Sequence, residues 1–270
     1  MIRRLVRRPR RHVLLAAAAA AIVISICTTI IALAHGAAHP DANLDSGARA
    51  SATPHASSPP LGTPSATGTA AIDAPTATTV AAVTGSSVAI STRAGAAPTR
   101  TLQNPQPSGA PLVFRVVQRS GQWLEVLLPV RPNGSTGWIR SSSVSLSTDP
   151  YAVVVTVATH TLDLYNHGRL IDTYRVATGT GGTPTPRGRF ALTELLQPSN
   201  SGYGPYAYGT TAFSDVLNSF GGGPGQIGLH GTDDTSSIGR DGSHGCVRMR
   251  NADITALARL LPLGTPFQVR

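Results

Sequence analysis

The segment of residues 227–250, IGLHGTDDTSSIGRDGSHGCVRMR, constrains this chain more than any other part of the sequence. It contains two histidines, His230 and His244, and the cysteine Cys246. The other cysteine of the chain, Cys27, lies in an apolar run near the N-terminus, so Cys246 has no disulfide partner in the part expected to fold. An unpaired cysteine of this kind is either buried and inert or kept for its reactivity.

The residues around Cys246 favour reactivity. Gly245 lets the backbone approach a substrate closely, and Ser243 and His244 put polar groups beside the sulfur. A thiol is only slightly ionised at neutral pH, so a nucleophilic cysteine requires a base or positively charged surroundings. We therefore expect a basic side chain within reach of Cys246.

An imidazole base for Cys246 must come from earlier in the chain, because no histidine follows it. His244 is two residues away, and in a strand it would share a face with Cys246 but be poorly aimed for proton transfer. His230 follows an apolar run typical of a strand end, and a loop rich in Asp, Ser and Gly separates it from Cys246. Two neighbouring strands joined by this loop would bring the two side chains together. We expect His230 to be the base and Cys246 the nucleophile.

The N-terminal segment indicates export. Residues 13–34 carry no charge and are long enough to span a bilayer, for which about 20 apolar residues suffice. Six arginines before this run supply most of the formal net charge of +9, and by the positive-inside rule they keep the N-terminus in the cytoplasm. We expect residues 1–34 to form a basic tail and a membrane anchor, which places the rest of the chain in the cell envelope.

A cleaved signal peptide ending at Ala34 is the alternative, because Ala32 and Ala34 form a small-residue cleavage pattern. The apolar run is longer than the roughly 7–15 residues usual for a signal peptide, which favours the anchor. Cleavage would give a secreted protein. Both alternatives place the folded part of the chain outside the cytoplasm.

The sequence after the apolar run divides by composition. Residues 35–84 are rich in Ala, Ser, Thr, Pro and Gly and offer little that forms a core, which predicts a disordered linker. The residues after the linker contain no basic stripe interleaved with aromatic residues. No nucleic-acid partner is therefore expected, and we expect a monomer.

Residues 85–148 have the pattern of a small all-β module. Two short apolar runs alternate with turn-rich segments, and a turn signal at Asn133-Gly134 precedes a third run. The three runs are residues 111–117, 123–128 and 136–140. We expect Trp138 to be a core residue, whereas Trp123 fits either a core or a binding platform.

Residues 149–270 predict a larger β-rich domain. Its predicted strands are residues 152–158, 161–165, 169–176 and 189–196. A tight turn at 166–168 makes the first three a β-meander. Residues 198–225 are aromatic and glycine-rich, and a loop of this length in a compact domain is usually functional, often as a lid over an active site.

The end of the chain predicts one helix and one strand. Asn251 is a good N-cap, Asp253 lies in the first turn, and apolar residues then recur with the period of a helix. These apolar residues are Ile254, Leu257, Ala258 and Leu261. Proline and glycine end the helix, and residues 266–269 fit a final strand.

Several of these motifs resemble a known family. His-Gly at 230–231, followed after a loop by SHGCVR at 243–248, resembles the signature of the L,D-transpeptidase catalytic domain (YkuD-like) of bacterial cell-wall synthesis. The glycine- and proline-rich stretch at 177–190, ATGTGGTPTPRGRF, is similar to a turn of the same family. The arrangement WLEV … TGWI within 85–148 resembles bacterial SH3-like domains.

The resemblance implies a mainly β fold. We expect an L,D-transpeptidase-type β-sandwich with a C-terminal helix over residues 149–270, a small SH3-like β-barrel over 85–148, and an N-terminal transmembrane helix. The implied activity is that of a cysteine-dependent peptidoglycan L,D-transpeptidase, which acts on stem peptides and joins their third-position residues through a thioester acyl-enzyme. No metal or other cofactor is expected.

The resemblance also implies site residues beyond His230 and Cys246. Oxyanion or substrate-binding roles are expected for Gly231, Ser243, His244, Gly245 and Arg248. The backbone N–H groups around Gly245 and Cys246 are expected to be oxyanion donors. Arg248 fits a substrate carboxylate, and an ion pair with Asp233, Asp234 or Asp241 is the alternative.

Other functions remain open from the sequence. With water as acceptor the same site would be an L,D-carboxypeptidase, and with a protein amine it would anchor proteins to the wall. A zinc site built from His230, His244 and Cys246 with Asp233 or Asp234 has suitable ligand types, but its spacing is unlike that of a closed structural site. A non-enzymatic wall-binding protein is a further alternative, which the reactive-cysteine motif disfavours.

Overall fold

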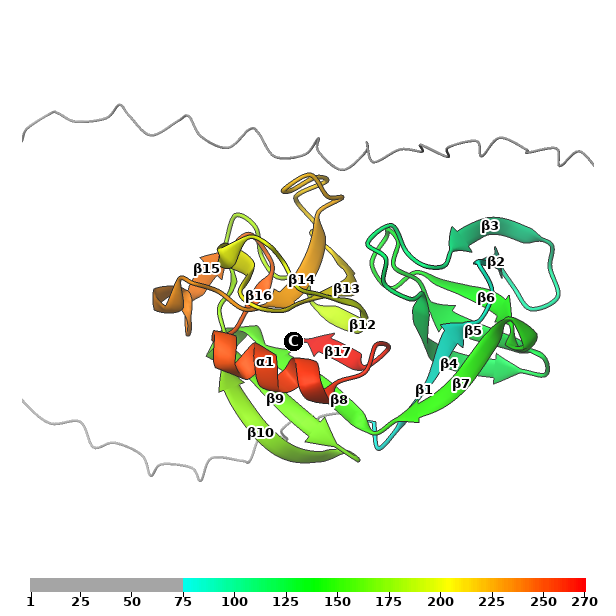
Figure 1. Cartoon of the computed structure of the whole chain (residues 1–270), viewed down its shortest axis with the longest axis horizontal. Helices are drawn as coiled ribbons and strands as arrows, with labels where there is room; N and C mark the ends of the chain where they lie inside the picture. Colours follow the sequence, from blue (N-terminus) through cyan, green and yellow to red (C-terminus); the bar gives the residue numbers. More distant parts are fainter. Residues whose placement is uncertain (1–74) are drawn as a thin grey trace, which may run out of the picture. The chain divides into compact units, whose positions relative to one another are not determined.

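The computed structural model describes residues 75–270 (Figure 1). Its strands are β1 Thr78–Val83, β2 Ser87–Ser91, β3 Pro98–Gln103, β4 Val113–Ser120, β5 Trp123–Leu127, β6 Thr136–Arg140, β7 Val144–Asp149, β8 Tyr151–Thr156, β9 Thr161–Asn166, β10 Arg169–Arg175, β11 Thr178–Gly179, β12 Gly188–Leu196, β13 Ala207–Phe213, β14 Gln226–His230, β15 Asp241–Ser243, β16 Val247–Arg248 and β17 Pro266–Val269. The helix α1 spans Asn251–Leu260, and four 3-10 turns lie at η1 Ser141–Ser143, η2 Val157–Thr159, η3 Ser201–Tyr203 and η4 Thr235–Ser237.

The predicted basic tail and membrane anchor at 1–34, and most of the predicted linker, lie outside the described residues. Within residues 75–270, no helix combines the length and the apolar character needed to cross a membrane.

The first seven strands form one antiparallel sheet, and we refer to residues 78–149 as the first module. The strand order is β3-β2-β6-β5-β4-β1-β7. The three runs predicted in this region are confirmed as β4, β5 and β6. Its core contains Val88, Phe114, Leu124, Val126 and Ile139 among other apolar residues. The expectation for Trp138 was wrong, because its side chain is only half-buried and its neighbour Ile139 fills the core instead.

Strand β1 corrects the predicted linker, which was expected to extend to residue 84. It pairs with β4 on one side and with β7 on the other. The segment TTVAAV has the alanine and threonine content of a linker, but its Ala81 and Val83 side chains are buried in the core of the module. Composition therefore concealed a strand whose stability comes from its two neighbours rather than from its own residues.

The remaining strands form mainly one eight-stranded sheet, in the order β10-β9-β8-β17-β12-β13-β14-β16. The predicted meander is confirmed, since β8, β9 and β10 pair as consecutive antiparallel strands. The turn between β9 and β10 places His167 and Gly168 at positive φ angles of 49° and 73°, as a two-residue hairpin turn requires. The last predicted strand is confirmed as β17, which lies parallel to β8.

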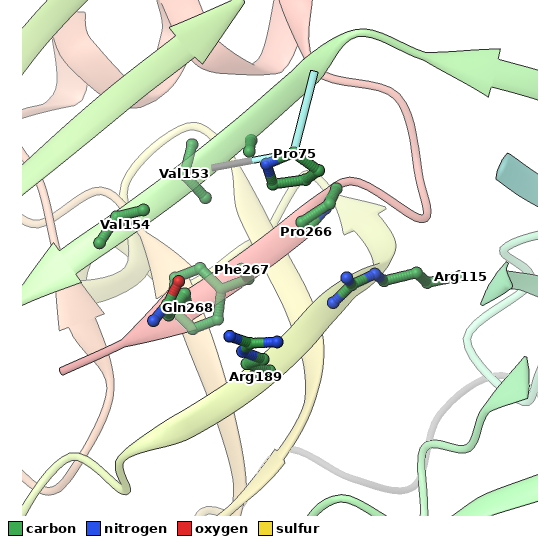
Figure 2. A pocket seen from close by; sticks show the side chains of 9 residues that line it. Pro75, Arg115, Val153, Val154, Arg189, Pro266, Phe267 and Gln268 are labelled. Atoms are coloured by element: carbon green, nitrogen blue, oxygen red, sulfur yellow. The ribbon is translucent and has the colours of Figure 1, made fainter. Parts of the chain in front are cut away.

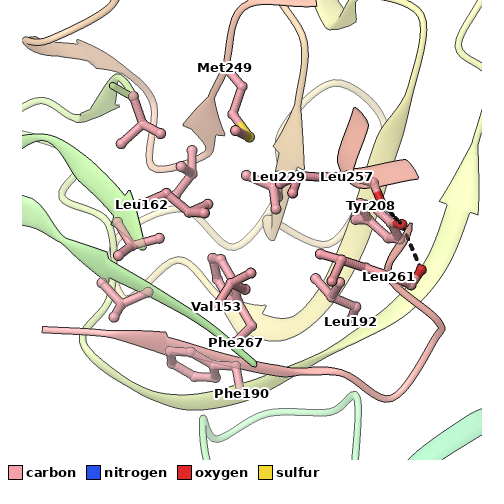
Figure 3. Packing of buried hydrophobic residues seen from close by; sticks show 14 of the residues in the cluster. Val153, Leu162, Phe190, Leu192, Tyr208, Leu229, Met249, Leu257, Leu261 and Phe267 are labelled. Carbon is pink, nitrogen blue, oxygen red and sulfur yellow. Dashed lines mark hydrogen bonds between the residues drawn. The ribbon is translucent and has the colours of Figure 1, made fainter. Parts of the chain in front are cut away.

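The eight-stranded sheet curves around a single core. Leu162 of β9 and Leu229 of β14 belong to the same cluster of buried side chains, although four strands lie between them in the sheet order (Figure 3). In a flat sheet these two strands would be about 24 Å apart, given a spacing of roughly 4.8 Å between neighbours. The two ends of the sheet must therefore fold toward each other, and Ile254 and Leu257 of α1 join the same cluster.

Strand β13 lies within the segment 198–225 that was predicted as one long loop, so that prediction was wrong in part. Tyr208 and Thr210 of β13 are fully buried, and the strand pairs with β12 and β14. The glycine at 209 obscured the strand pattern, yet it lets β13 pass close to Glu194, whose carboxylate would clash with any Cβ at this position. The true loop between β13 and β14 is residues 214–225.

Helix α1 confirms the predicted helix but not its predicted cap. The capping position is Arg250, and Asn251 is the first helical residue. The side chain of Asn251 accepts a hydrogen bond from the backbone N–H of Thr232, at 3.0 Å, because this N–H follows β14 and lacks a strand partner. At the other end, the Tyr208 hydroxyl lies 3.2 Å from the carbonyl oxygen of Leu257 and 2.8 Å from that of Leu261 (Figure 3).

Candidate active site

The two predicted catalytic residues lie on neighbouring strands. β14 and β16 pair in parallel, with Leu229 opposite Val247 and His230 opposite Arg248. Cys246 immediately precedes β16, so the parallel pairing places it beside the β14 segment that ends in His230. The loop rich in Asp, Ser and Gly joins these two strands, as the sequence predicted.

His230 and Cys246 face the same space above Gly228. A methyl group on Gly228 would lie 3.6 Å from the ring carbon Cδ2 of His230 and 3.9 Å from the sulfur of Cys246. The ring carbon Cδ2 of His230 and the sulfur of Cys246 can therefore be no farther apart than these two distances added together. Gly228 also donates its backbone N–H to the sulfur, at 3.3 Å. The glycine at this position leaves room for both reactive groups.

His230 is held as a neutral imidazole with a defined tautomer. Its Nδ1 lies 2.6 Å from the carbonyl oxygen of Gly231, an acceptor, so Nδ1 carries the proton and Nε2 keeps a free lone pair. The side chain is 3% exposed, and this burial lowers its pKa to about 4, with a smaller contribution from the charge of Arg248. The carbonyl of Gly231 therefore fixes the orientation of the His230 ring.

Cys246 is a protonated thiol at neutral pH. Burial raises its pKa, while the Gly228 N–H and the positive charge of Arg248 act in the opposite direction. The site therefore rests as a neutral thiol beside a neutral imidazole rather than as an ion pair. The two groups that favour the thiolate are already in place, since the Gly228 N–H contacts the sulfur and the charge of Arg248 acts on it.

The turn before Cys246 is held by Ser243. The buried Ser243 hydroxyl lies 2.5 Å from the carbonyl oxygen of Cys246, and it accepts the N–H of Gly245 at 3.1 Å. Gly245 has a φ of +115°, a conformation that disfavours any side chain. Its carbonyl accepts a hydrogen bond from Thr185 at 2.9 Å.

These bonds correct the expected oxyanion donor. The N–H of Gly245 already donates to Ser243, so it is not free to bind an oxyanion. No described residue accepts a hydrogen bond from the N–H of Cys246, which leaves that group as the remaining donor of the predicted pair. Gly231 has a positioning role as well, because its N–H donates to Tyr206 and its carbonyl holds His230.

Arg248 forms none of the three ion pairs considered from the sequence. Within residues 75–270 the ion pair found is between His160 and Asp241, at 3.0 Å. Arg248 donates from Nη1 to the carbonyl oxygen of Gly242 at 3.1 Å, and its buried Nε lacks a hydrogen-bond partner. The guanidinium therefore contributes charge to the site and keeps donor capacity for a ligand.

Two aromatic residues of the site were not predicted individually. The ring of Tyr203 lies 4.7 Å from the ring of His230, at 45°. Phe220, in the loop between β13 and β14, stacks on His244 with ring centroids 5.0 Å apart, and His244 itself is exposed. The signal in the sequence was the aromatic content of 198–225, but without a regular period it did not indicate which residues turn inward.

Cys246 and His230 line a cavity of about 180 Å³. Its other walls come from β12, β13, β14, η3 and the loop between β13 and β14, and include Glu194, Leu196, Tyr203, Ala207, Tyr208, Phe220, Pro224, Gln226 and Ile227. The cavity is open to solvent and mostly apolar, as ligand sites in proteins commonly are.

A second cavity, of about 60 Å³, is lined by residues of β8, β12 and β17 together with Arg115 of the first module (Figure 2). It contains none of the predicted site residues. No group of three or more His, Cys, Asp or Glu side chains in the described part of the chain is arranged to hold a metal ion.

The chain is similar to known L,D-transpeptidases. Residues 150–269 match the family model described as the L,D-transpeptidase catalytic domain, YkuD. A Bacillus licheniformis protein that bears the name L,D-transpeptidase YkuD is 38% identical over 122 residues, which cover 45% of this chain and 67% of that protein.

A Bacillus subtilis (strain 168) protein with the same name is 32% identical over 145 residues, which cover 52% of this chain and 81% of that protein. Among solved structures, an L,D-transpeptidase from Mycobacterium smegmatis aligns with a TM-score of 0.38 and 14% identity, over 68% of this chain and 99% of that one.

Proposed function

The chain belongs to the L,D-transpeptidase family, and from this premise we propose that it is a cysteine-dependent enzyme that cross-links peptidoglycan stem peptides. The observation that carries the proposal is the shared pocket. Cys246 and His230 both line it, and Nδ1 of His230 is occupied by Gly231, which leaves Nε2 to accept a proton. A thiol and a correctly oriented base are the two parts that thioester chemistry requires.

The first half of the reaction is acylation. Nε2 of His230 accepts the thiol proton as the sulfur of Cys246 attacks the carbonyl carbon of the third residue of a donor stem peptide. The new C–S bond gives a tetrahedral oxyanion, to which the N–H of Cys246 donates. Collapse breaks the C–N bond to the terminal D-alanine, whose amine takes the proton from the imidazolium. The product is a thioester on Cys246 and free D-alanine.

The second half transfers the acyl group. The side-chain amine of a second stem peptide attacks the thioester carbonyl and gives up a proton to His230. The C–S bond then breaks, an amide forms between two third-position residues, and the proton passes to the departing sulfur. The thiol proton leaves on D-alanine and a proton from the acceptor amine replaces it, so His230 transfers one proton in each half and the enzyme returns to its starting protonation state.

The resting protonation states suit this cycle. Because both groups are neutral before substrate binds, proton transfer accompanies attack instead of preceding it. The Gly228 N–H and Arg248 then stabilise the negative charge that develops on the sulfur. A neutral resting thiol also limits reaction with other electrophiles.

Mass spectrometry of the full chain incubated with disaccharide-tetrapeptides tests the activity. We expect peptide-linked dimers and a covalent adduct on Cys246, both of which disappear in Cys246→Ala. Cys27→Ala, which removes the other cysteine, is the control and should keep both products. Tripeptides without dimers would instead support an L,D-carboxypeptidase, and dimer formation by Cys246→Ala would overturn the nucleophile.

We also propose that the catalytic domain works outside the cytoplasm, anchored by residues 13–34. Their apolar character and the six preceding arginines support this placement, as does the location of peptidoglycan. Intact cells treated with a membrane-impermeant thiol reagent should be labelled on Cys246. Labelling only after lysis would contradict the proposal.

For the first module we propose the SH3-like class, on the resemblance of its WLEV and TGWI segments. These segments form the adjacent strands β5 and β6.

A further inference from the structure

The loop of residues 214–225, which we call the β13–β14 loop, forms part of the wall above Cys246. Phe220 and Pro224 of this loop line the same cavity as His230 and Cys246. Phe220 also stacks on His244, which lies two residues before the cysteine. Phe220 is 43% exposed, so the loop presents apolar surface in the cavity that contains the reactive sulfur.

The loop has few internal means of keeping one conformation. It contains four glycines, three of which have positive φ angles, and glycine loses more conformational freedom on ordering than any other residue. Backbone hydrogen bonds within the loop join its two arms at the base and close the turn at its tip. Ser214 donates its N–H to Gly225 at 2.8 Å, and Phe220 exchanges two hydrogen bonds with Gly223, each at 3.0 Å.

Arg131 of the first module holds the base of the loop from both sides. Its guanidinium donates to the carbonyl oxygens of Ser214 at 2.7 Å, Leu217 at 2.8 Å and Pro224 at 3.2 Å. The same group lies over the ring of Phe213, 5.1 Å from its centroid. These carbonyls belong to both arms of the loop, so one rigid fork ties the two arms together.

Asn133 holds the strand that leads into the loop. Its side-chain amide accepts the N–H of Phe213 at 2.8 Å and donates to the carbonyl oxygen of the same residue at 2.8 Å. It also donates to the carboxylate of Asp215 at 3.1 Å. The amide thus pairs with Phe213 as a residue of a neighbouring strand would, at the point where β13 ends.

We propose that Arg131 and Asn133 are positioning residues, through which the first module holds the β13–β14 loop over the Cys246 pocket and sets the rate of acyl transfer. The proposal rests on the proposed function for its kinetic part. Its physical basis is that hydrogen bonds to a charged group are stronger than neutral ones. The three bonds from Arg131 and the two bonds between Asn133 and Phe213 together offset the entropy cost of ordering a glycine-rich loop. The first module then contributes to catalysis without touching the substrate.

The test uses Arg131→Gln and Asn133→Ala in the full chain, with Arg100→Gln as the control. Arg100 lies on exposed strand β3 of the same module. We expect kcat/KM for tetrapeptide cross-linking to fall about tenfold in each of the first two variants, since a tenfold change corresponds to losing one charge-assisted or paired hydrogen bond. Alkylation of Cys246 by iodoacetamide, which needs no loop contact, should not slow. Unchanged kcat/KM in both variants, or an equal loss in Arg100→Gln, would refute the proposal.

A double-mutant cycle with Phe220→Ala separates positioning from general destabilisation. If Asn133 acts through the loop, the loss in the double variant should be smaller than the product of the single losses. Losses that simply multiply would show that Asn133 acts independently of Phe220.

Chymotrypsin cleavage after Phe220 tests, without any reference to activity, whether Arg131 and Asn133 hold the β13–β14 loop. We call this set of contacts the clamp. Cleavage of the folded chain should speed up in Arg131→Gln and Asn133→Ala and stay at the wild-type rate in Arg100→Gln. If the wild-type chain proved inactive while this pattern held, the proposed function would fail and the clamp would stand. Equal cleavage rates in all four chains would refute the clamp.

Discussion

Burial sets the protonation of single residues at the centre of this site. The imidazole of His230 is deprotonated because desolvation lowers its pKa to about 4, and the thiol of Cys246 stays protonated because desolvation raises its pKa. Both shifts arise from packing against the strands, and the nearby charge of Arg248 acts on both groups. Neither shift follows from the identity of the residues alone.

The acid limb of the pH–rate profile should report His230. Because the base must be neutral, kcat/KM should hold steady from pH 7 to about 5 and fall as the pH drops through about 4, where the imidazole takes up a proton. Thioester formation measured across this range checks the prediction. The control His167→Asn, in the exposed turn after β9, should show the same fall in kcat/KM at acid pH as the wild-type chain. A midpoint near 6.5 would mean that His230 is not buried as described.

Tyr203 should matter through its ring. The ring packs against His230 and limits how far the imidazole can turn away from the sulfur. Tyr203→Ala should therefore lower kcat by up to about tenfold, the scale of one aromatic contact, whereas Tyr203→Phe should retain most of the activity. Steady-state kinetics of both variants checks this. An equal loss in Tyr203→Phe would assign the effect to the hydroxyl.

At the scale of elements, the site depends on the parallel pair β14 and β16 and on the helix that follows. β16 pairs with β14 over only two residue positions, so it needs support from the segment after it. That support comes from α1, which buries Ile254 and Leu257 in the same core, and whose end is tied to β13 through Tyr208. The helix is thus scaffold for the cysteine.

Removing the Tyr208 hydroxyl should loosen this tie. Tyr208→Phe leaves the carbonyl oxygen of Leu261 without its donor, whereas that of Leu257 keeps the backbone N–H of Leu261, and we expect the free energy of unfolding to fall by about 1–2 kcal/mol. Urea unfolding with an unchanged m-value checks it. Tyr151→Phe is the control, since no hydrogen bond of its hydroxyl is found in the described structure. A smaller loss in Tyr208→Phe than in the control would contradict the tie.

At the scale of the whole molecule, the first module is complete only with β1. The strand lies between β4 and β7, and its Ala81 and Val83 belong to the core of the module. A chain shortened to begin at Pro75 retains β1 and should therefore keep cooperative unfolding of the module, whereas one that begins at Gly85 should lose it. Calorimetry of the two chains checks the prediction. Equal transitions in both would show that β1 adds nothing.

The sequence predicted those elements whose signals are local. The meander β8–β10 follows from β-branched runs and a turn at 166–168, and α1 follows from its apolar period. Strands β1 and β13 were not predicted from the sequence, because alanine, threonine and glycine carry no clear strand pattern until neighbouring strands bury them. Likewise, Asn251 looked like a cap from its type and place, but the loop after β14 offered its side chain a different partner.

By itself, the sequence determined the family of the chain and the chemistry to propose for it, since Cys246, an upstream histidine and the SHGCVR motif at 243–248 leave few reactions to consider. Only the tertiary structure decided which groups surround these residues. It gave the N–H of Gly245 to Ser243, placed Tyr203 against His230, and brought Arg131 to the β13–β14 loop. Such contacts join residues far apart in the chain, and they form only when burial of the cores brings distant strands together.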